Sequence, residues 1–187
     1  ALIVNNPDYL ERAKILQEKG TDRTAFLEGK VDKYTWQWLG SSYLLSELQA
    51  AYLLPQLEQL EILNKQREAY WGYYLDALKD IELEGFFELP TVPAFCSHNA
   101  HIFAIKVEPM IRNRIIEGMR NKRINCTSHY TPLHTSIAGK DFSRFDGVDV
   151  YTTKASKSVL RLPIYNQLSQ QQLHYVSASL LEMVRAL

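Results

Sequence analysis

Cysteine is scarce in this sequence, which contains only Cys96 and Cys126. Two isolated cysteines exclude a disulfide framework and are too few for a cysteine-rich zinc site. We therefore expect two reduced thiols in a cytoplasmic protein. Long apolar runs are lacking too, since none approaches the roughly 20 residues of a membrane span. The first residues also lack the basic-then-apolar order of a signal peptide.

An excess of one charge is also missing, because 21 Lys and Arg balance 21 Asp and Glu. This balance gives no electrostatic basis for a nucleic-acid-binding surface. The eight glycines are scattered and form no Gly-x-Gly-x-x-Gly or Walker pattern, and no Gly-x-Ser-x-Gly elbow occurs. What is present is the composition of a soluble globular protein of 187 residues, enough for one sizeable core or a small domain with part of another.

The first part of the chain predicts a strand, a helix and a long loop. Ala1 to Val4 are apolar and indicate an interior strand already under way, so we expect that an N-terminal portion of the protein precedes them. Apolar residues at helical spacing predict a helix from Leu10 to Leu16, which Gly20 ends. Residues 21–39 show no sustained periodicity and predict a loop of a length typical of functional loops.

A long helix is predicted next. Ser46 begins it and forms a capping box with Gln49, and an apolar stripe continues to Lys79. Pro55 should kink this helix or divide it in two. The stripe predicts a packing face, against its own domain or against a second subunit, with a ligand surface as the alternative. We expect one domain at residues 1–85, which ends with this helix, and another at 86–187.

The second domain is predicted to be a small α+β domain whose helices cover one face of a sheet. Its predicted elements are strands at 101–107, 124–128 and 158–162 and helices at 110–122 and 169–186. Ser169 and Gln172 form a second capping box at the last helix. The segment 88–93 contains two prolines and predicts an extended linker, because each proline disfavours helix in the residue before it.

One candidate binding segment lies in the predicted loop. Lys33, Tyr34 and Trp36 combine a positive charge with aromatic rings, which suits a nucleotide diphosphate through stacking and charge. The same rings could equally anchor the loop on the core. Ser41 and Ser42 follow, and their hydroxyl and N–H groups lie near a helix N-terminus, where a phosphate is favoured.

A second candidate segment follows the strand predicted at 124–128. In the sequence His-Tyr-Thr-Pro-Leu-His, the proline fixes a turn, so that His129, Tyr130 and His134 could face a sugar. Alternatively, these side chains cap the strand and hydrogen-bond its backbone. No Cys, Asp or Glu joins the histidines at ligand spacing, so we expect no metal site.

Three segments together indicate a family. The sequence from Gly40 to Ala51 resembles the Gly-aromatic-Asn-Tyr-Arg-Met-Ser-Glu-Leu-Gln-Ala-Ala signature of the DegT/DnrJ/EryC1/StrS aminotransferases. The His-Tyr-x-Pro-Leu-His loop and Leu162 to Tyr165 occur in the family's order, so the resemblance covers essentially the whole chain. It implies an α/β to α+β fold, namely the C-terminal part of a fold type I aminotransferase that uses pyridoxal phosphate (PLP). This part is the end of the large domain plus the small C-terminal domain.

The resemblance also implies a cofactor and a partner. The family attaches PLP to a lysine and acts as a homodimer whose active sites lie between subunits. That lysine would lie before Ala1, so we expect this chain alone to bind no PLP and to be inactive. Ser42, with Ser41 beside it, stands where the family has an asparagine that reaches the PLP phosphate across the dimer. Leu44 stands at a common arginine position.

By the same alignment, Lys33, Tyr34 and Trp36 would line the entrance for a sugar nucleotide. His129, Tyr130 and His134 would approach the hexose; the substrate-binding residues are therefore expected to be Lys33, Tyr34, Trp36, His129, Tyr130 and His134.

The substrates implied are a dTDP-sugar and glutamate. The aromatic segment around Lys33 is most similar to members that aminate dTDP-4-oxo-6-deoxy-D-glucose with glutamate as donor. Two alternatives stay open. The enzyme could act on another 4-keto sugar nucleotide, as perosamine and aminoarabinose synthases do, or the chain could be a non-catalytic module that binds nucleotide sugars or a partner protein.

Overall fold

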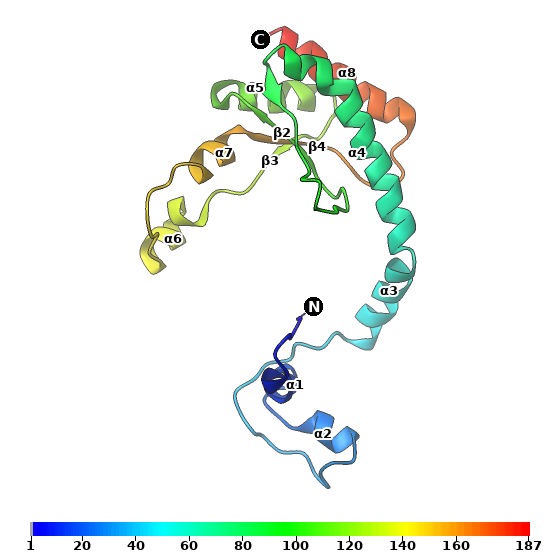
Figure 1. The fold of residues 1–187 in the computed structure, drawn as a ribbon, viewed down its shortest axis with the longest axis vertical. Helices are drawn as coiled ribbons and strands as arrows, with labels where there is room; N and C mark the ends of the chain where they lie inside the picture. Colours follow the sequence, from blue (N-terminus) through cyan, green and yellow to red (C-terminus); the bar gives the residue numbers. More distant parts are fainter. Residues whose placement is uncertain (1) are drawn as a thin grey trace. The chain divides into compact units, whose positions relative to one another are not determined.

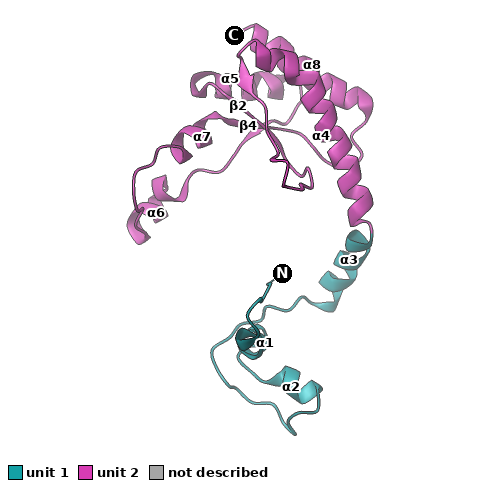
Figure 2. Cartoon of the chain, viewed as in Figure 1, with its two compact units in different colours: residues 1–58 teal, residues 59–187 magenta. Residues whose placement is uncertain are grey.

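The computed structural model describes residues 2–187, which form two compact units (Figure 1). The first unit ends at Glu58 and the second extends from Gln59 to Leu187 (Figure 2). The units divide earlier in the chain than the domain boundary expected after residue 85, because helix α4 (Leu60–Leu83) packs against α8 (Gln170–Arg185). The division into a large-domain part, 1–85, and a small domain, 86–187, stays a prediction.

The first unit consists of short helices joined by extended segments. Its elements are η1 (Pro7–Tyr9), α1 (Leu10–Gln17), α2 (Arg23–Leu27) and α3 (Glu47–Glu58). Helix α1 confirms the predicted first helix. The predicted strand is wrong for residues 2–4, because a strand needs a hydrogen-bonding neighbour and none of the described residues pairs with them. Ala1 lies outside the described residues. Helix α2 lies within the segment predicted as a loop.

Helix α3 begins with the predicted capping box. The Ser46 N–H donates to Oε1 of Gln49 at 3.0 Å, and the Gln49 N–H donates to Oγ of Ser46 at 3.3 Å. Pro55 lies inside α3, where it can donate no N–H to the carbonyl oxygen of Ala51. The predicted division of the long helix comes after the proline, at Gln59 between α3 and α4.

The second unit is built on an antiparallel sheet, three of whose strands are labelled in Figure 1. The strand order is β1-β2-β4-β3. In chain order after α4, its elements are β1 (Phe87–Glu88), β2 (Phe103–Val107), α5 (Pro109–Asn121), β3 (Thr127–Ser128), η2 (Leu133–Thr135), α6 (Ile137–Phe142), α7 (Thr152–Ser158), β4 (Val159–Leu162) and α8. The predicted α+β arrangement is thus present. The strand predicted at 124–128 is shorter, because the Ile124 N–H donates to the carbonyl oxygen of Met119 and the Cys126 N–H to that of Ile124, which leaves only Thr127 and Ser128 to pair with β4.

One face of the sheet carries the core. Phe103 pairs with Leu162 across β2 and β4, and Ile105 pairs with Leu160, which puts all four side chains on the same buried face. Helices α4, α5 and α8 cover this face (Figure 1). Their buried apolar residues are Tyr70, Tyr74, Leu78, Ile81, Ile115, Met119, Leu173, Val176, Leu180 and Val184.

The apolar stripe of the long predicted helix has two different environments. Its later residues, from Tyr70 to Leu78, pack in the core as expected. Its earlier residues Leu57 and Leu60 are exposed. Although α4 has 24 residues, it is not apolar enough to span a bilayer, and neither is any other helix within residues 2–187.

The two cysteines have opposite environments, which predicts a difference in reactivity. Cys126 lies in the core, and burial raises the pKa of its thiol from 9.0 to about 12. Because each pKa unit changes the thiolate fraction tenfold near neutral pH, the reactive thiolate of Cys126 is far rarer than that of an exposed thiol. Cys96 is exposed. We expect Ellman's reagent to modify one thiol in the folded protein and the second only after denaturation.

A Cys96→Ser variant is the control for this prediction, since it leaves Cys126 as the single thiol. It should show no rapid reaction while folded. Rapid modification of this variant under native conditions would contradict the burial of Cys126.

Candidate functional site

The first group of predicted residues lies on the aromatic loop, residues 31–39, which folds back on the turn after α1. The N–H groups of Gln37 and Trp38 both donate to the carbonyl oxygen of Gly20, at 2.7 and 3.0 Å. A Cβ atom on Gly40 would lie 2.1 Å from the backbone nitrogen of Gly20. Glycine at both positions therefore allows the two backbone segments to meet.

Asp22 fixes the tip of this loop. Its carboxylate accepts a hydrogen bond from the Thr35 N–H at 2.7 Å and another from Nε2 of Gln37 at 2.9 Å. The Asp22 N–H in turn donates to the carbonyl oxygen of Thr35 at 3.2 Å. The loop thus has a defined backbone path, and its exposed side chains project from a fixed base.

The three predicted residues of the aromatic loop differ in how they are held. The rings of Tyr34 and Phe26 lie 5.6 Å apart between centroids, so Tyr34 is anchored on α2. Trp36 is 79% exposed and is held through its backbone, which pairs with Thr21. Lys33 is exposed as well. Trp36 and Lys33 are therefore the side chains most available to a ligand.

Trp38, in contrast, anchors the loop on the rest of the first unit. The guanidinium carbon of Arg12 lies 3.9 Å from the centroid of its ring. This cation–π contact joins the aromatic loop to α1 and contributes about 0.5–1 kcal/mol at an exposed position. The aromatic side chains of the loop thus divide between anchoring and exposure.

Ser41 and Ser42, the predicted phosphate contacts, lie in the extended segment before α3. Ser42 pairs with Glu18 in an antiparallel bridge, and the Ser41 N–H donates to the carbonyl oxygen of Leu16 at 3.0 Å. Both side chains are exposed, and neither hydroxyl group takes part in a hydrogen bond among the described residues. The hydroxyl groups are therefore free to contact a phosphate, whereas the N-terminus of α3 is capped by Ser46.

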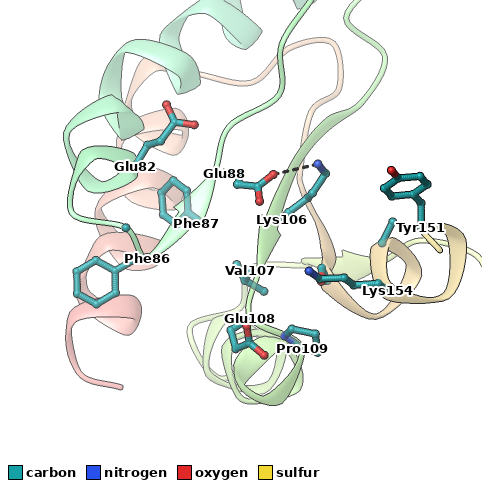
Figure 3. Close-up of a pocket in the computed structure, with 13 residues that line it drawn as sticks. Glu82, Phe86, Phe87, Glu88, Lys106, Val107, Glu108, Pro109, Tyr151 and Lys154 are labelled. Carbon is teal, nitrogen blue, oxygen red and sulfur yellow. Dashed lines mark hydrogen bonds and ion pairs between the residues drawn. The ribbon is translucent and has the colours of Figure 1, made fainter.

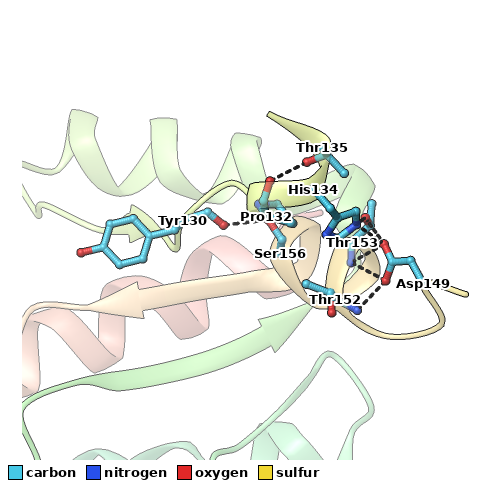
Figure 4. Close-up of polar contacts among 8 residues, drawn as sticks. All are labelled: Tyr130, Pro132, His134, Thr135, Asp149, Thr152, Thr153 and Ser156. Atoms are coloured by element: carbon cyan, nitrogen blue, oxygen red, sulfur yellow. Dashed lines mark hydrogen bonds and ion pairs between the residues drawn. The ribbon is translucent and has the colours of Figure 1, made fainter. Parts of the chain in front are cut away.

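The second group of predicted residues lies in the second unit, directly after β3. The rings of His129 and Tyr130 lie 4.7 Å apart, and Tyr130 is 79% exposed. The Tyr130 carbonyl oxygen accepts a hydrogen bond from Oγ of Ser156 at 3.0 Å (Figure 4). The backbone is thus anchored to α7, while both rings remain accessible to a ligand.

His134 is not exposed in this way, because its imidazole is engaged by a carboxylate. Its Nε2 lies 2.8 Å from Oδ2 of Asp149 (Figure 4), and its ring lies 4.4 Å from the ring of Phe145. Hydrogen bonds from Thr153 and His134 lower the pKa of the Asp149 carboxyl to about 2, so this group is a carboxylate at neutral pH. His134 bonds neither the β3 backbone nor the two neighbouring predicted residues.

Sequence reasoning missed the residues that organise both groups, namely Asp22 and Asp149. Each aspartate precedes a short helix, α2 or α7, and an aspartate before a helical run is a helix-start signal that could have located both. Their partners are 13 and 15 residues away, at Thr35 and His134, and no local pattern identifies such contacts. Within residues 2–187, no three His, Cys, Asp or Glu side chains lie together as a metal site needs.

A separate open cavity of about 550 Å³ lies in the second unit, between the end of α4, strands β1 and β2 and helix α7 (Figure 3). Glu88 and Lys106 form an ion pair at 3.0 Å at its wall, and Lys154 and Tyr151 line it from the side of α7. Because the Glu88–Lys106 pair is exposed, it contributes at most about 1 kcal/mol. The cavity contains none of the predicted site residues.

Known relatives match the chain over almost all of its length. Erythromycin biosynthesis sensory transduction protein EryC1 of Saccharopolyspora erythraea is 27% identical over 181 residues, which cover 96% of this chain and 46% of that protein. The dTDP-3-amino-3,6-dideoxy-alpha-D-galactopyranose transaminase of Aneurinibacillus thermoaerophilus is 26% identical over 177 residues, which cover 94% of this chain and 44% of that protein. The chain thus spans about half the length of these relatives.

Solved structures show the same fold. The aminotransferase TlmJ from Streptoalloteichus hindustanus superimposes with a TM-score of 0.82 at 18% identity, over 97% of this chain and 46% of that one. NtdA from Bacillus subtilis, solved with bound cofactor PMP, superimposes with a TM-score of 0.80 at 22% identity, over 97% and 41%. These matches confirm the predicted fold class, the C-terminal part of a PLP fold type I aminotransferase. The model of the DegT/DnrJ/EryC1/StrS aminotransferase family matches residues 1–181, and the chain belongs to that family.

Proposed function

We propose that this chain is part of a PLP-dependent transaminase that converts dTDP-4-oxo-6-deoxy-D-glucose to dTDP-4-amino-4,6-dideoxy-D-galactose, with glutamate as the amino donor. Family membership supports the reaction class. The choice of substrate rests on the aromatic loop. In this loop, Trp36 and Lys33 are both exposed, and Asp22 holds the backbone. The reaction would serve enterobacterial common antigen biosynthesis.

Each group of residues would bind one part of the sugar nucleotide. The indole ring of Trp36 would stack on the thymine base, and the ammonium group of Lys33 would pair with the diphosphate. Tyr34 would border this entrance from its position on Phe26. The exposed rings of His129 and Tyr130 would approach the hexose.

The residues of this chain would contact the phosphate group of PLP. The free hydroxyl groups of Ser41 and Ser42 suit a phosphate, and in a homodimer Ser42 would reach the cofactor of the partner subunit. PLP, when bound, supplies the electron sink for amino-group transfer. We propose that the lysine that holds it lies outside this chain, so that residues 1–187 alone are inactive.

The test is a transamination assay of the protein that contains this chain, with glutamate and three 4-keto sugar nucleotides. We expect the highest kcat/KM with dTDP-4-oxo-6-deoxy-D-glucose, and lower values with the precursors of perosamine and aminoarabinose. A preference for either of those would contradict the substrate. Binding without turnover would favour the non-catalytic module, and borohydride trapping of PLP on residues 1–187 alone would contradict their inactivity.

A Trp36→Ala variant tests the entrance within the same assay. Loss of base stacking, worth about 1–3 kcal/mol, should raise the KM for the sugar nucleotide about 5- to 150-fold. The kcat should change little, because a base contact is remote from the reacting carbon. Phe95→Ala is the matched control, since Phe95 is 92% exposed and was not assigned to the site. Equal KM values for the two variants would contradict the proposal that Trp36 stacks on the base.

A further inference from the structure

Asp149 has a rigid position at the start of α7. The Thr152 N–H donates to its Oδ1 at 2.9 Å, the Thr153 N–H reaches both oxygens at 3.3 Å, and the Thr153 hydroxyl group donates to Oδ2 (Figure 4). These donors fix the orientation of the carboxylate before His134 is considered. The imidazole therefore meets an acceptor whose direction is already set.

This contact determines which nitrogen of His134 carries the proton. A carboxylate can only accept hydrogen bonds, and Oδ2 of Asp149 lies 2.8 Å from Nε2 of His134. Nε2 must therefore be protonated. A neutral imidazole has one N–H group, so Nδ1 keeps its lone pair. Among residues 2–187, no group hydrogen-bonds to Nδ1.

The ring is also restrained against rotation. It lies 4.4 Å from the ring of Phe145 at an interplanar angle of 31°, and the side chain of His134 is 18% exposed. A flip that exchanged the two ring nitrogens would break the bond to Asp149. The imidazole thus presents one donor to the protein and one unused acceptor.

We propose that Asp149 is a positioning residue that holds His134 as the Nε2–H tautomer, so that Nδ1 accepts a hydrogen bond from a hydroxyl group of the substrate. The substrate half of this inference rests on the proposed function. The tautomer half rests on the contacts of Asp149 alone. Asp149 itself touches no substrate and acts through His134.

Nitrogen NMR of the protein labelled with 15N-histidine tests the tautomer directly. In the neutral form of the ring, we expect His134 to show a protonated Nε2 and an unprotonated Nδ1. In Asp149→Asn, the amide oxygen should stay with the Thr152 and Thr153 N–H groups, which need an acceptor. The amide NH₂ then faces Nε2, so His134 should switch to the Nδ1–H tautomer while the start of α7 stays capped.

Thr153→Val is the matched control, because it removes the hydroxyl group that donates to Asp149 and lies 3.5 Å from Nε2 of His134, but leaves the shorter bond between Asp149 and His134. Its His134 should remain the Nε2–H tautomer. If His134 of the unaltered protein proves to be the Nδ1–H form, or if Asp149→Asn leaves the tautomer unchanged, the inference is wrong.

The substrate half is tested by kinetics on a further variant. His134→Phe keeps a planar ring but removes the Nδ1 acceptor, so the KM for the sugar nucleotide should rise about 3- to 10-fold. The midpoint of thermal unfolding of Asp149→Asn should fall less than that of Asp149→Ala, which loses the acceptor for the Thr152 and Thr153 N–H groups. An unchanged KM in His134→Phe would overturn the substrate contact. A protein that turns over no sugar nucleotide would defeat the proposed function and leave the tautomer result standing.

Discussion

Replacing Phe103 by alanine should lower the free energy of unfolding of the second unit by about 3–5 kcal/mol, the range for buried phenylalanine. Phe103 is fully buried, and its ring lies 5.2 Å from that of Tyr74 and 5.4 Å from that of Trp71. It also pairs with Leu162 on β4. The substitution therefore removes contacts to both the helix layer and the sheet. Because a domain is stable by only about 5–15 kcal/mol, this loss brings the unit close to unfolding.

Chemical denaturation followed by circular dichroism measures this effect. Phe95→Ala makes the same chemical change at an exposed position and should alter the free energy of unfolding by less than about 0.5 kcal/mol. Similar changes in the free energy of unfolding for the two variants would show that the packing of Phe103 against α4 contributes little to the stability of the core.

Replacing Gly20 by alanine should release the aromatic loop from α1. Gly20 has a φ of 79°, which costs an L-residue about 1–2 kcal/mol, and a Cβ there would lie 1.9 Å from the carbonyl oxygen of Trp38. Since this neighbour is backbone, the loop itself must move. Hydrogen exchange should show the Gln37 and Trp38 amides, which bond to the Gly20 carbonyl oxygen, losing most of their protection.

Gly29→Ala is the control that separates the cost of a positive φ from the clash of an added Cβ. Gly29 has a similar φ, 70°, but no atom lies within 4 Å of the position of an added Cβ. It carries the conformational cost without the clash, so the Gln37 and Trp38 amides should stay protected. If the Gln37 and Trp38 amides of Gly20→Ala stay protected from exchange, the close approach of the aromatic loop to the turn after α1 does not depend on a glycine at position 20.

Features that depend on neighbours in sequence were predictable. Both capping boxes, at Ser46 and Ser169, join residues three apart, and both occur as expected. The alternation around Phe103 identified the central strand β2, and the exposure of Trp36 suits its predicted role. The fold class followed from motifs spread over the whole chain rather than from any single element.

Features that depend on distant partners were not predictable. His134 has the same residue type as His129, yet one is held by a carboxylate 15 residues away and the other is exposed. Helix α7 contains no large apolar residue, and the N–H groups of its first two residues donate to Asp149, three residues before it. Residues 2–4 have the composition of a strand, but a strand also requires a partner. In each case tertiary contacts, which a local pattern does not contain, decide the outcome.

The first unit buries only Glu18, Gly20 and Thr21 among residues 2–58, and none of these has a large apolar side chain. Its short segments are joined by backbone hydrogen bonds, such as that from Ser41 to Leu16. Opening such a structure exposes little additional apolar surface to water. Its opening should therefore have a small heat-capacity change and a weak dependence on urea, whereas unfolding of the second unit should show both strongly.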